Sequence, residues 1–343
     1  MREGKLGKYD PRPPVPKNER MKTSAMIASL AAEGMPTITA PFGKALVELA
    51  EKDEKILGLS ADLAKYTDIY VFRDKYPDRF YQMGMAEQAL VSAAAGLARE
   101  GFQPFATTYA VFAARRAYDF ICMAIAEENL DVKIVAALPG LTSGYGPSHQ
   151  ATEDIAIFRG MPNMTIIDPC CGTEIMQATH AIAAYKGPVY MRLLRGQVPD
   201  VLSAYDYQFE LGKAKMIRDG RDALFISTGL MTMRALEAAK RLEDNNIDCG
   251  VLHVPTIKPL DTASIIEAAG KTGRMVVVAE NHTVVGGLGE GVARILLSAG
   301  VTPEFRQIAL PDAFLDAGAL PTLHDRYGLS VDAVCAKVKG WLG

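Results

Sequence analysis

The sequence predicts an α/β protein built from two doubly wound domains. Short apolar runs alternate with amphipathic helical patterns along most of the chain, which is typical of a mostly parallel sheet covered by helices. A polar, tyrosine-bearing stretch near residue 200 interrupts this alternation once and divides it into two series. The length of 343 residues also favours about two domains, each large enough to bury its own core.

Residues 1–35 are predicted to form an N-terminal arm and a short helix. Four prolines between positions 11 and 16 lie among basic residues, so the segment 1–20 cannot form a helix or strand of its own. A helical pattern over 21–33 then ends at Gly34 and Pro36. The composition does not distinguish a disordered tail from an arm that lies on a partner subunit.

Residues 36–196 form the first predicted domain. Its helical patterns cover 42–51, 87–99, 111–126 and 173–185, and its apolar runs cover 56–59, 103–106, 133–138, 164–167 and 189–193. Residues 197–220 are predicted to be a linker. A smaller domain over 221–343 follows, with strands at 223–227, 249–253 and 275–279 and helices at 231–243, 262–269 and 291–299.

Composition and charge exclude several classes of partner. The chain is 49% apolar and 22% charged with a net charge of -3, so we expect neither nucleic acid nor an anionic membrane as a partner. No apolar run approaches the roughly 18 residues of a membrane span, and the N-terminus lacks the apolar core of a signal peptide. Five cysteines without a disulfide framework suit a reducing compartment. A cytoplasmic protein is expected, with cysteines that serve in packing.

Glu87 is the most informative single residue. It stands at the start of an apolar helical pattern, directly after the turn Gly84-Met85-Ala86. A carboxylate in that position is expected to hydrogen-bond a ligand nitrogen instead of water.

Two further signals follow the neighbouring strands. Tyr109 and Phe112 are three residues apart on one face of a predicted helix, where they could sandwich a flat heterocycle or simply belong to the core. His149 lies in a glycine- and proline-containing loop beyond the strand 133–138, at the carboxyl end of the sheet. A loop histidine is often only a solvated or capping residue, but here we expect it to transfer protons.

The glycine-rich segment 286–291 superficially resembles a phosphate-binding loop. Its spacing does not match Gly-x-Gly-x-x-Gly, so a tight turn and close helix packing are expected instead of a bound dinucleotide. Common metal-binding patterns are also missing from the sequence, and no protein-only metal site is expected.

Taken in order, these motifs resemble the C-terminal half of transketolase. The resemblance covers Pro36 to the C-terminus and is carried by 60–63, 83–88, 108–112, 146–150, and 281–282 with the glycine turn. It implies a pyrimidine-binding domain, a smaller transketolase C-terminal domain, and thiamine diphosphate as the cofactor. The resemblance implies that Glu87 bonds N1′ of the aminopyrimidine and favours the imino tautomer, whose nitrogen removes the thiazolium C2 proton.

Further roles come from the same resemblance. Tyr109 and Phe112 match residues that stack on the pyrimidine, Asp62 matches one that lines the cofactor site, and Arg115 stands where a third pocket aromatic is often found.

The substrate-binding positions are inferred in the same way. His149 matches a histidine that handles substrate hydroxyl protons, and Gln150 adjoins it in the motif. Arg195 resembles a residue that grips the anionic end of the substrate, and Lys65 is a second candidate for that role. Tyr145 lies where many relatives carry an acid that bonds sugar hydroxyls, and Leu138 replaces a histidine. Sugar recognition is therefore expected to be altered.

The family anchors Mg²⁺ and the diphosphate through a Gly-Asp-Gly motif, which this sequence lacks. A partner with the diphosphate-binding domain is therefore expected to supply the Mg²⁺ ligands, in an α2β2 assembly.

The leading hypothesis is a split transketolase that moves a two-carbon ketol unit from a ketose to an aldose phosphate. The donor could be nonstandard, such as apulose 4-phosphate or sulfofructose. Two alternatives stay open: a pyruvate-using relative, either a deoxyxylulose phosphate synthase half or a 2-oxoacid dehydrogenase β subunit, and a noncatalytic scaffold subunit.

Overall fold

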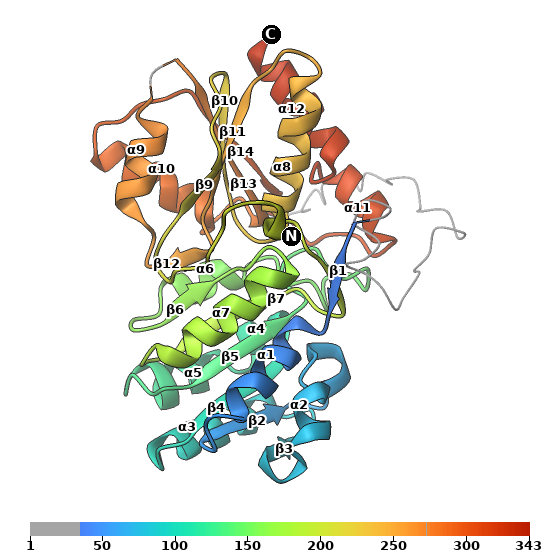
Figure 1. The fold of residues 1–343 in the computed structure, drawn as a ribbon, viewed down its shortest axis with the longest axis vertical. Coiled ribbons are helices and arrows are strands. Elements are labelled where there is room, and N and C mark those ends of the chain that lie inside the picture. The colour runs from blue at the N-terminus through green and yellow to red at the C-terminus, as the bar shows by residue number, and fades with distance from the viewer. Residues whose placement is uncertain (1–34, 272) are drawn as a thin grey trace, which may run out of the picture.

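The chain folds into two α/β domains that lie one above the other (Figure 1). The structure is a computed structural model that describes residues 35–271 and 273–343. The predicted arm and helix within 1–34 lie outside the described residues. The predicted α/β class with two domains is confirmed.

The first domain is built on a seven-stranded sheet in the order β12-β6-β7-β5-β4-β2-β3. Its strands are β2 (Ile56–Ser60), β3 (Phe80–Gln82), β4 (Gln103–Tyr109), β5 (Lys133–Ala137), β6 (Thr165–Ile167), β7 (Val189–Leu193) and β12 (Thr256–Lys258). All neighbours are parallel except β12, which runs antiparallel to β6. Strands β2, β4, β5 and β7 are buried along their whole length, as expected for parallel strands covered on both faces.

Helices cover both faces of this sheet. On one face α1 packs against α2 and α7, and on the other α3 packs against α4 and α5. Their bounds are α1 (Pro41–Ala50), α2 (Tyr70–Lys75), α3 (Glu87–Arg99), α4 (Ala110–Arg116), α5 (Tyr118–Ile121), α6 (Asp154–Arg159) and α7 (Gly172–Ala184). The single helix predicted over 111–126 is wrong, because the chain breaks at Ala117 and continues as α5 and a π-helical turn, Cys122–Ala126. The apolar spacing continues through this break, so periodicity does not reveal it.

The second domain has a five-stranded sheet in the order β14-β13-β10-β11-β9. Its strands are β9 (Lys215–Arg218), β10 (Ala223–Ser227), β11 (Cys249–His253), β13 (Met275–Thr283) and β14 (Phe305–Leu310). Helices α8 and α12 pack together, as do α9 and α10, and α11 follows β14. The helices are α8 (Leu230–Glu243), α9 (Thr262–Ala269), α10 (Leu288–Ser298), α11 (Leu320–Arg326) and α12 (Val331–Leu342). No helix among the described residues is both long and apolar enough to cross a membrane.

The segment predicted to be a linker, 197–220, contains two strands. The first, β8 (Gln197–Pro199), pairs with β1 (Thr37–Thr39), and β9 forms an edge of the second sheet. Strands of three or four residues are too short for an alternating pattern to identify them. The second half of the chain also adds β12 to the first sheet, which ties the two domains together.

Candidate functional site

The predicted site residues gather at the carboxyl edge of the first sheet. Strands β2, β4, β5 and β7 are parallel and in register, so their carboxyl ends meet at one edge. Asp62 follows β2, Tyr109 ends β4, His149 lies in the loop after β5, and Arg195 follows β7. Glu87 comes after β3, which extends the same sheet. This is the edge at which ligands bind in open α/β folds.

Glu87 begins α3 and its carboxylate is shielded from water. The residue is only 2% exposed. Arg116 Nη1 donates to its Oε1 at 3.2 Å and to its Oε2 at 3.4 Å. The positive end of the helix dipole also favours a carboxylate at this position. Glu87 is therefore held as a paired, nearly dry acceptor at the site.

Aromatic rings form one wall of the site. The ring centres of Tyr109 and Phe112 are 5.6 Å apart, and that of His149 lies 6.1 Å from Tyr109 and 5.4 Å from Phe112. Tyr145 lies 5.3 Å from His149 and is exposed. The guanidinium carbon of Arg116 sits 3.9 Å from the centre of the Phe112 ring. The structure thus brings Glu87, through Arg116, into contact with the aromatic wall.

His149 is half-buried and its environment favours the neutral imidazole. Its Nδ1 lies 2.9 Å from Ser148 Oγ. Burial lowers the pKa of His149, and the charge of Arg116 lowers it further. A neutral imidazole near pH 7 can accept a proton from a substrate hydroxyl.

Arg115 holds the His149 loop. The sequence places Arg115 among the cofactor-binding residues, but its guanidinium pairs with the Glu153 carboxylate and donates to the carbonyl oxygens of Pro147, at 2.9 Å, and Gln150, at 3.3 Å. These contacts do not test the predicted cofactor role of Arg115, which stays a prediction. Its side chain is tied to the loop, because Glu153 and two loop carbonyls accept from three of its five N–H groups.

Gln150 ties the same loop to the second domain. Its Nε2 donates to the carbonyl oxygens of Ser143, at 3.2 Å, and Asp316, at 3.0 Å, and the residue is 1% exposed. Its Oε1 is buried and has no hydrogen-bond partner among the described residues. The amide nitrogen of Gln150 thus anchors the loop, and its predicted substrate contact stays a prediction.

Arg195 carries an unused donor at the site. Its Nε is buried and has no hydrogen-bond partner within 35–271 and 273–343. Its guanidinium lies 5.4 Å from the Tyr66 ring. The pKa of Tyr109 is raised by burial, an effect that the nearby Arg195 charge opposes. Arg195 is therefore a cation beside two tyrosines and is suited to bind an anionic group.

Asp68 fixes the backbone next to Arg195. Its carboxylate accepts the N–H of Gly196 at 2.9 and 3.1 Å. Burial raises the pKa of Asp68 to about 7, although the Gly196 N–H and the Arg195 charge both act to lower it. The residue was not identified from the sequence, because 128 positions separate the two partners.

Asp62 and Lys65 lie on the exposed rim of the site. Asp62 has a left-handed φ of 61°; its N–H donates to Gln82 Oε1 at 2.7 Å, and Gln82 Nε2 donates back to its carboxylate at 3.2 Å. Lys65 belongs to the 3₁₀ turn Ala64–Thr67, next to Tyr66. Both side chains remain open to solvent at the carboxyl edge.

The glycine turn encloses a carboxylate of the chain itself. Glu280 accepts the N–H groups of Leu288, at 2.6 Å, and Gly289, at 2.8 Å. A Cβ atom at Gly287 would lie 2.0 Å from Glu280 Oε2. The prediction of a tight turn with close packing is confirmed, since Glu280 takes the donors that a phosphate would need.

One buried cluster has the residue types of a metal site. Ligand atoms of Cys170, Glu174 and His253 lie within 4.8 Å of one another. However, His253 Nε2 lies 2.8 Å from Glu174 Oε1, whereas two ligands of a tetrahedral zinc are about 3.3 Å apart. Glu174 also accepts the Cys170 N–H at 2.6 Å and the Tyr207 hydroxyl. The cluster is therefore satisfied as a hydrogen-bond network.

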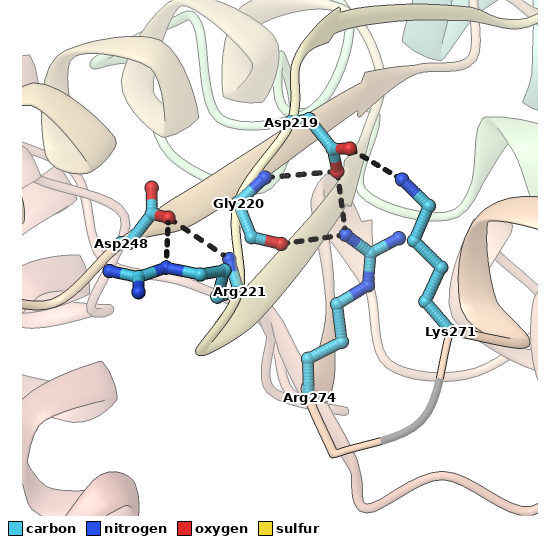
Figure 2. A pocket seen from close by; sticks show the side chains of 6 residues that line it. All are labelled: Asp219, Gly220, Arg221, Asp248, Lys271 and Arg274. Carbon is cyan, nitrogen blue, oxygen red and sulfur yellow. Dashed lines mark hydrogen bonds and ion pairs between the residues drawn. The ribbon is translucent and has the colours of Figure 1, made fainter.

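The second domain has a surface hollow at the edge of its five-stranded sheet where β10, β11 and β13 begin. It is lined by Asp219, Gly220, Arg221, Asp248, Lys271 and Arg274, next to the amino ends of β10, β11 and β13. Figure 2 shows that its acidic side chains pair with its basic ones. The hollow holds two carboxylates and three cations, so both acids are paired and one positive charge remains, and it contains none of the predicted site residues.

Arg116 is the main site residue that the sequence reasoning missed. It lies four residues after Phe112 on α4, so helical spacing alone places the two side chains on one face. Its contact with Glu87 has no such local signal, because the two residues are 29 positions apart.

Comparison with known proteins gives consistent matches. The transketolase pyrimidine-binding domain model matches residues 34–200, and the transketolase C-terminal domain model matches residues 212–334. A transketolase family protein of Sinorhizobium fredii, y4mN, is 71% identical over 94% of both chains. The 6-deoxy-6-sulfo-D-fructose transketolase subunit SqwH of a Clostridium species is 37% identical and covers 84% of this chain and 89% of its own. A solved structure described as a split gene transketolase, inactive β4 tetramer, is 41% identical, with a TM-score of 0.80 over 88% of this chain and 97% of that one.

Proposed function

Since the chain belongs to the transketolase family, we propose that it is the pyrimidine-binding and C-terminal subunit of a split, thiamine-diphosphate-dependent transketolase. The reaction is the transfer of a two-carbon ketol unit from a ketose to an aldose phosphate. One observation carries the proposal: the shielded Glu87 carboxylate, the Phe112 ring and His149 lie around Arg116 at the carboxyl edge of the sheet.

The residues at this edge fit an aminopyrimidine ring. A carboxylate with 2% exposure is a strong acceptor for a ring N–H, because water competes little for it. The Phe112 ring offers a flat face beside that carboxylate, and it already stacks on one planar group. When bound, thiamine diphosphate supplies the carbon nucleophile that attacks the ketose carbonyl. Glu87 would accept the N–H of ring nitrogen N1′ and so share that proton with the ring.

His149 and Arg195 act on the substrate side. His149 presents a neutral imidazole from the loop that Arg115 holds, so it accepts and returns protons at substrate hydroxyls. Arg195 binds the anionic end of the sugar through its guanidinium, whose Nε has no partner among the described residues. Lys65 adds positive charge on the rim.

A second polypeptide completes the enzyme. No Gly-Asp-Gly sequence occurs in the chain, so the diphosphate-binding domain and the Mg²⁺ ligands belong to a partner subunit. The related split gene transketolase is described as inactive when it is a β4 tetramer, which supports a requirement for another subunit. We infer an α2β2 assembly with active sites between subunits.

The donor is a ketose that differs from the usual phosphorylated sugars. Tyr145 takes the place of the acid that bonds sugar hydroxyls in many family members, and it lies against His149. Leu138, with a φ of 59°, directly follows β5, where a histidine is common in the family. The relative SqwH is named for a sulfonated fructose, and a sulfonate suits a site in which Arg195 provides the charge.

The test is reconstitution with a partner. The chain is co-expressed with a candidate subunit that carries Gly-Asp-Gly and is supplied with thiamine diphosphate and Mg²⁺. Sulfofructose, apulose 4-phosphate and common ketose phosphates are then offered as donors with glyceraldehyde 3-phosphate as acceptor. Ketose-dependent product formation supports the proposal and identifies the donor. Pyruvate consumption without ketose transfer would assign the chain to the pyruvate-using branch instead. Absence of reaction with every donor would favour a noncatalytic scaffold subunit. Full turnover by the chain without a partner would refute the split assembly.

A further inference from the structure

The Arg116 side chain makes two contacts at once, and both are with residues assigned to the cofactor. Its Nη1 donates to both carboxylate oxygens of Glu87, at 3.2 and 3.4 Å. Its guanidinium carbon lies 3.9 Å from the centre of the Phe112 ring. A single planar cation therefore covers the acceptor and the aromatic face together.

A guanidinium and a protonated aminopyrimidine present similar chemistry to a protein. Both are flat and delocalised, both donate N–H groups in their own plane, and both stack on aromatic rings. A ring that bonds Glu87 and stacks on Phe112 needs the surfaces that Arg116 covers in this structure. The two groups cannot make these contacts simultaneously.

We propose that Arg116 holds the place of the cofactor ring in this subunit and competes with it for Glu87 and Phe112. The inference rests on the proposed function, since it takes thiamine diphosphate as the competing ligand. Binding of the ring then requires the Arg116 side chain to leave both contacts.

The surroundings of Arg116 suit such an exchange. A buried carboxylate without a partner is costly, so a subunit that is made separately from its partner gains stability when Arg116 pairs with Glu87. The Arg116 side chain is 49% exposed, and Glu87 is its sole hydrogen-bond partner among the described residues. It can therefore swing into solvent without unpacking the core. The neighbouring Arg115 differs, because three partners tether it to the His149 loop.

Equilibrium binding tests the proposal without relying on turnover. The assembly with the partner subunit is titrated with thiamine diphosphate and Mg²⁺ in a calorimeter, for the native chain and for Arg116→Ala. If Arg116 is seated in about nine molecules of ten, its removal tightens the apparent Kd about tenfold. Arg116→Lys keeps the charge but loses the planar stack, so an intermediate gain is expected. The matched control is Arg99→Ala, which removes a side chain of 50% exposure that pairs with Glu128; its Kd should equal that of the native chain.

The outcomes separate this inference from the function on which it rests. Tighter binding of thiamine diphosphate by Arg116→Ala, with native binding by Arg99→Ala, supports competition between Arg116 and the cofactor ring. Equal or weaker binding by that variant, with measurable binding by the native assembly, overturns the inference and leaves the proposed function intact. Absence of binding in every assembly overturns both. If Arg116→Ala does not fold, Arg116→Lys carries the same comparison.

A second measurement uses the chain without its cofactor. A double-mutant cycle with Glu87→Gln and Arg116→Ala is followed by the thermal midpoint, Tm. If Arg116 and Glu87 are in contact in the isolated chain, the loss of Tm in the double variant is smaller than the sum of the two single losses. Additive losses would show that the two side chains do not interact in the isolated chain and would overturn the inference.

Discussion

Arg192 and Asp154 form a two-point ion pair inside the protein. Arg192 Nε donates to Asp154 Oδ2 at 2.9 Å and Nη2 donates to Oδ1 at 3.1 Å, and neither residue is more than 1% exposed. The same guanidinium reaches Asp168 at 2.9 Å and the carbonyl oxygen of Asn281 at 3.0 Å. Because Asn281 belongs to the second domain, this buried network joins the two domains behind the site.

Arg192→Met should destabilise the chain strongly. The variant leaves the carboxylates of Asp154 and Asp168 buried without their cation, which is expected to cost about 3–5 kcal/mol in the free energy of unfolding. Chemical denaturation measures the loss. The control is Arg221→Met, whose side chain is 85% exposed and whose ion pair should contribute no more than about 1 kcal/mol. Equal losses in the two variants would contradict the role given to Arg192.

Glu87→Gln should abolish most turnover while sparing the fold. Glutamine has nearly the same volume, but it cannot share a proton with a ring nitrogen as the carboxylate does. We expect kcat of the reconstituted assembly to fall at least about a hundredfold, with an unchanged circular dichroism spectrum. Glu128→Gln, on an exposed glutamate paired with Arg99, is the control. Native activity in Glu87→Gln would contradict the contact assigned between Glu87 and the cofactor ring.

His149→Gln should reduce the rate and remove one limb of its pH profile. Burial and the Arg116 charge lower the pKa of His149 below its ordinary value of 6.5, so the native imidazole stays neutral at pH 7 and becomes charged only in more acidic solution. The native kcat/KM is expected to fall on the acid side of pH 6.5. In the variant it should be about a hundredfold lower at pH 7 and should lack that fall. An unchanged acid limb would mean that another group titrates.

Arg195→Lys should weaken substrate binding more than it slows the chemistry. Lysine keeps the charge but loses the planar donor set, including the buried Nε that has no partner among the described residues. We expect KM for an anionic donor to rise about tenfold or more, with kcat within a few-fold of native. An uncharged ketose donor, which presents no anionic end to the guanidinium, should show little change in KM. A drop in kcat at unchanged KM would place Arg195 in the chemical step instead.

Asp68→Asn should change how stability depends on pH. Burial raises the pKa of Asp68 from 3.8 to about 7, so the folded protein binds this proton more tightly than the unfolded chain does. The native stability contributed by Asp68 is therefore greatest below pH 4 and declines as the pH rises from 4 to 7, by at most about 4 kcal/mol. Asparagine does not titrate, and its Oδ1 can still accept the Gly196 N–H. Chemical denaturation at several pH values should show that the free energy of unfolding of the native chain falls relative to that of Asp68→Asn between pH 4 and 7. Parallel pH dependences in the two proteins would contradict the raised pKa of Asp68.

The sequence by itself determined the fold class and most element positions, and it identified Glu87, Tyr109 and Phe112 as candidate site residues. These features have local signals: apolar runs and helical periodicity describe each strand or helix separately, and the helix predicted over 87–99 matches α3 in full. Parallel strands that follow one another along the chain also meet at a common carboxyl edge, so the approximate place of the site follows from their order.

The tertiary structure alone decided how the neighbouring side chains are used. Arg115 and Arg116 are adjacent in sequence, yet one binds loop carbonyls and the other pairs with Glu87, because successive residues of a helix point in different directions. The anchoring of Gln150 to the second domain and of Gly196 to Asp68 likewise joins segments more than 120 positions apart. Such contacts depend on the packing of whole domains, and no periodicity along the chain encodes them.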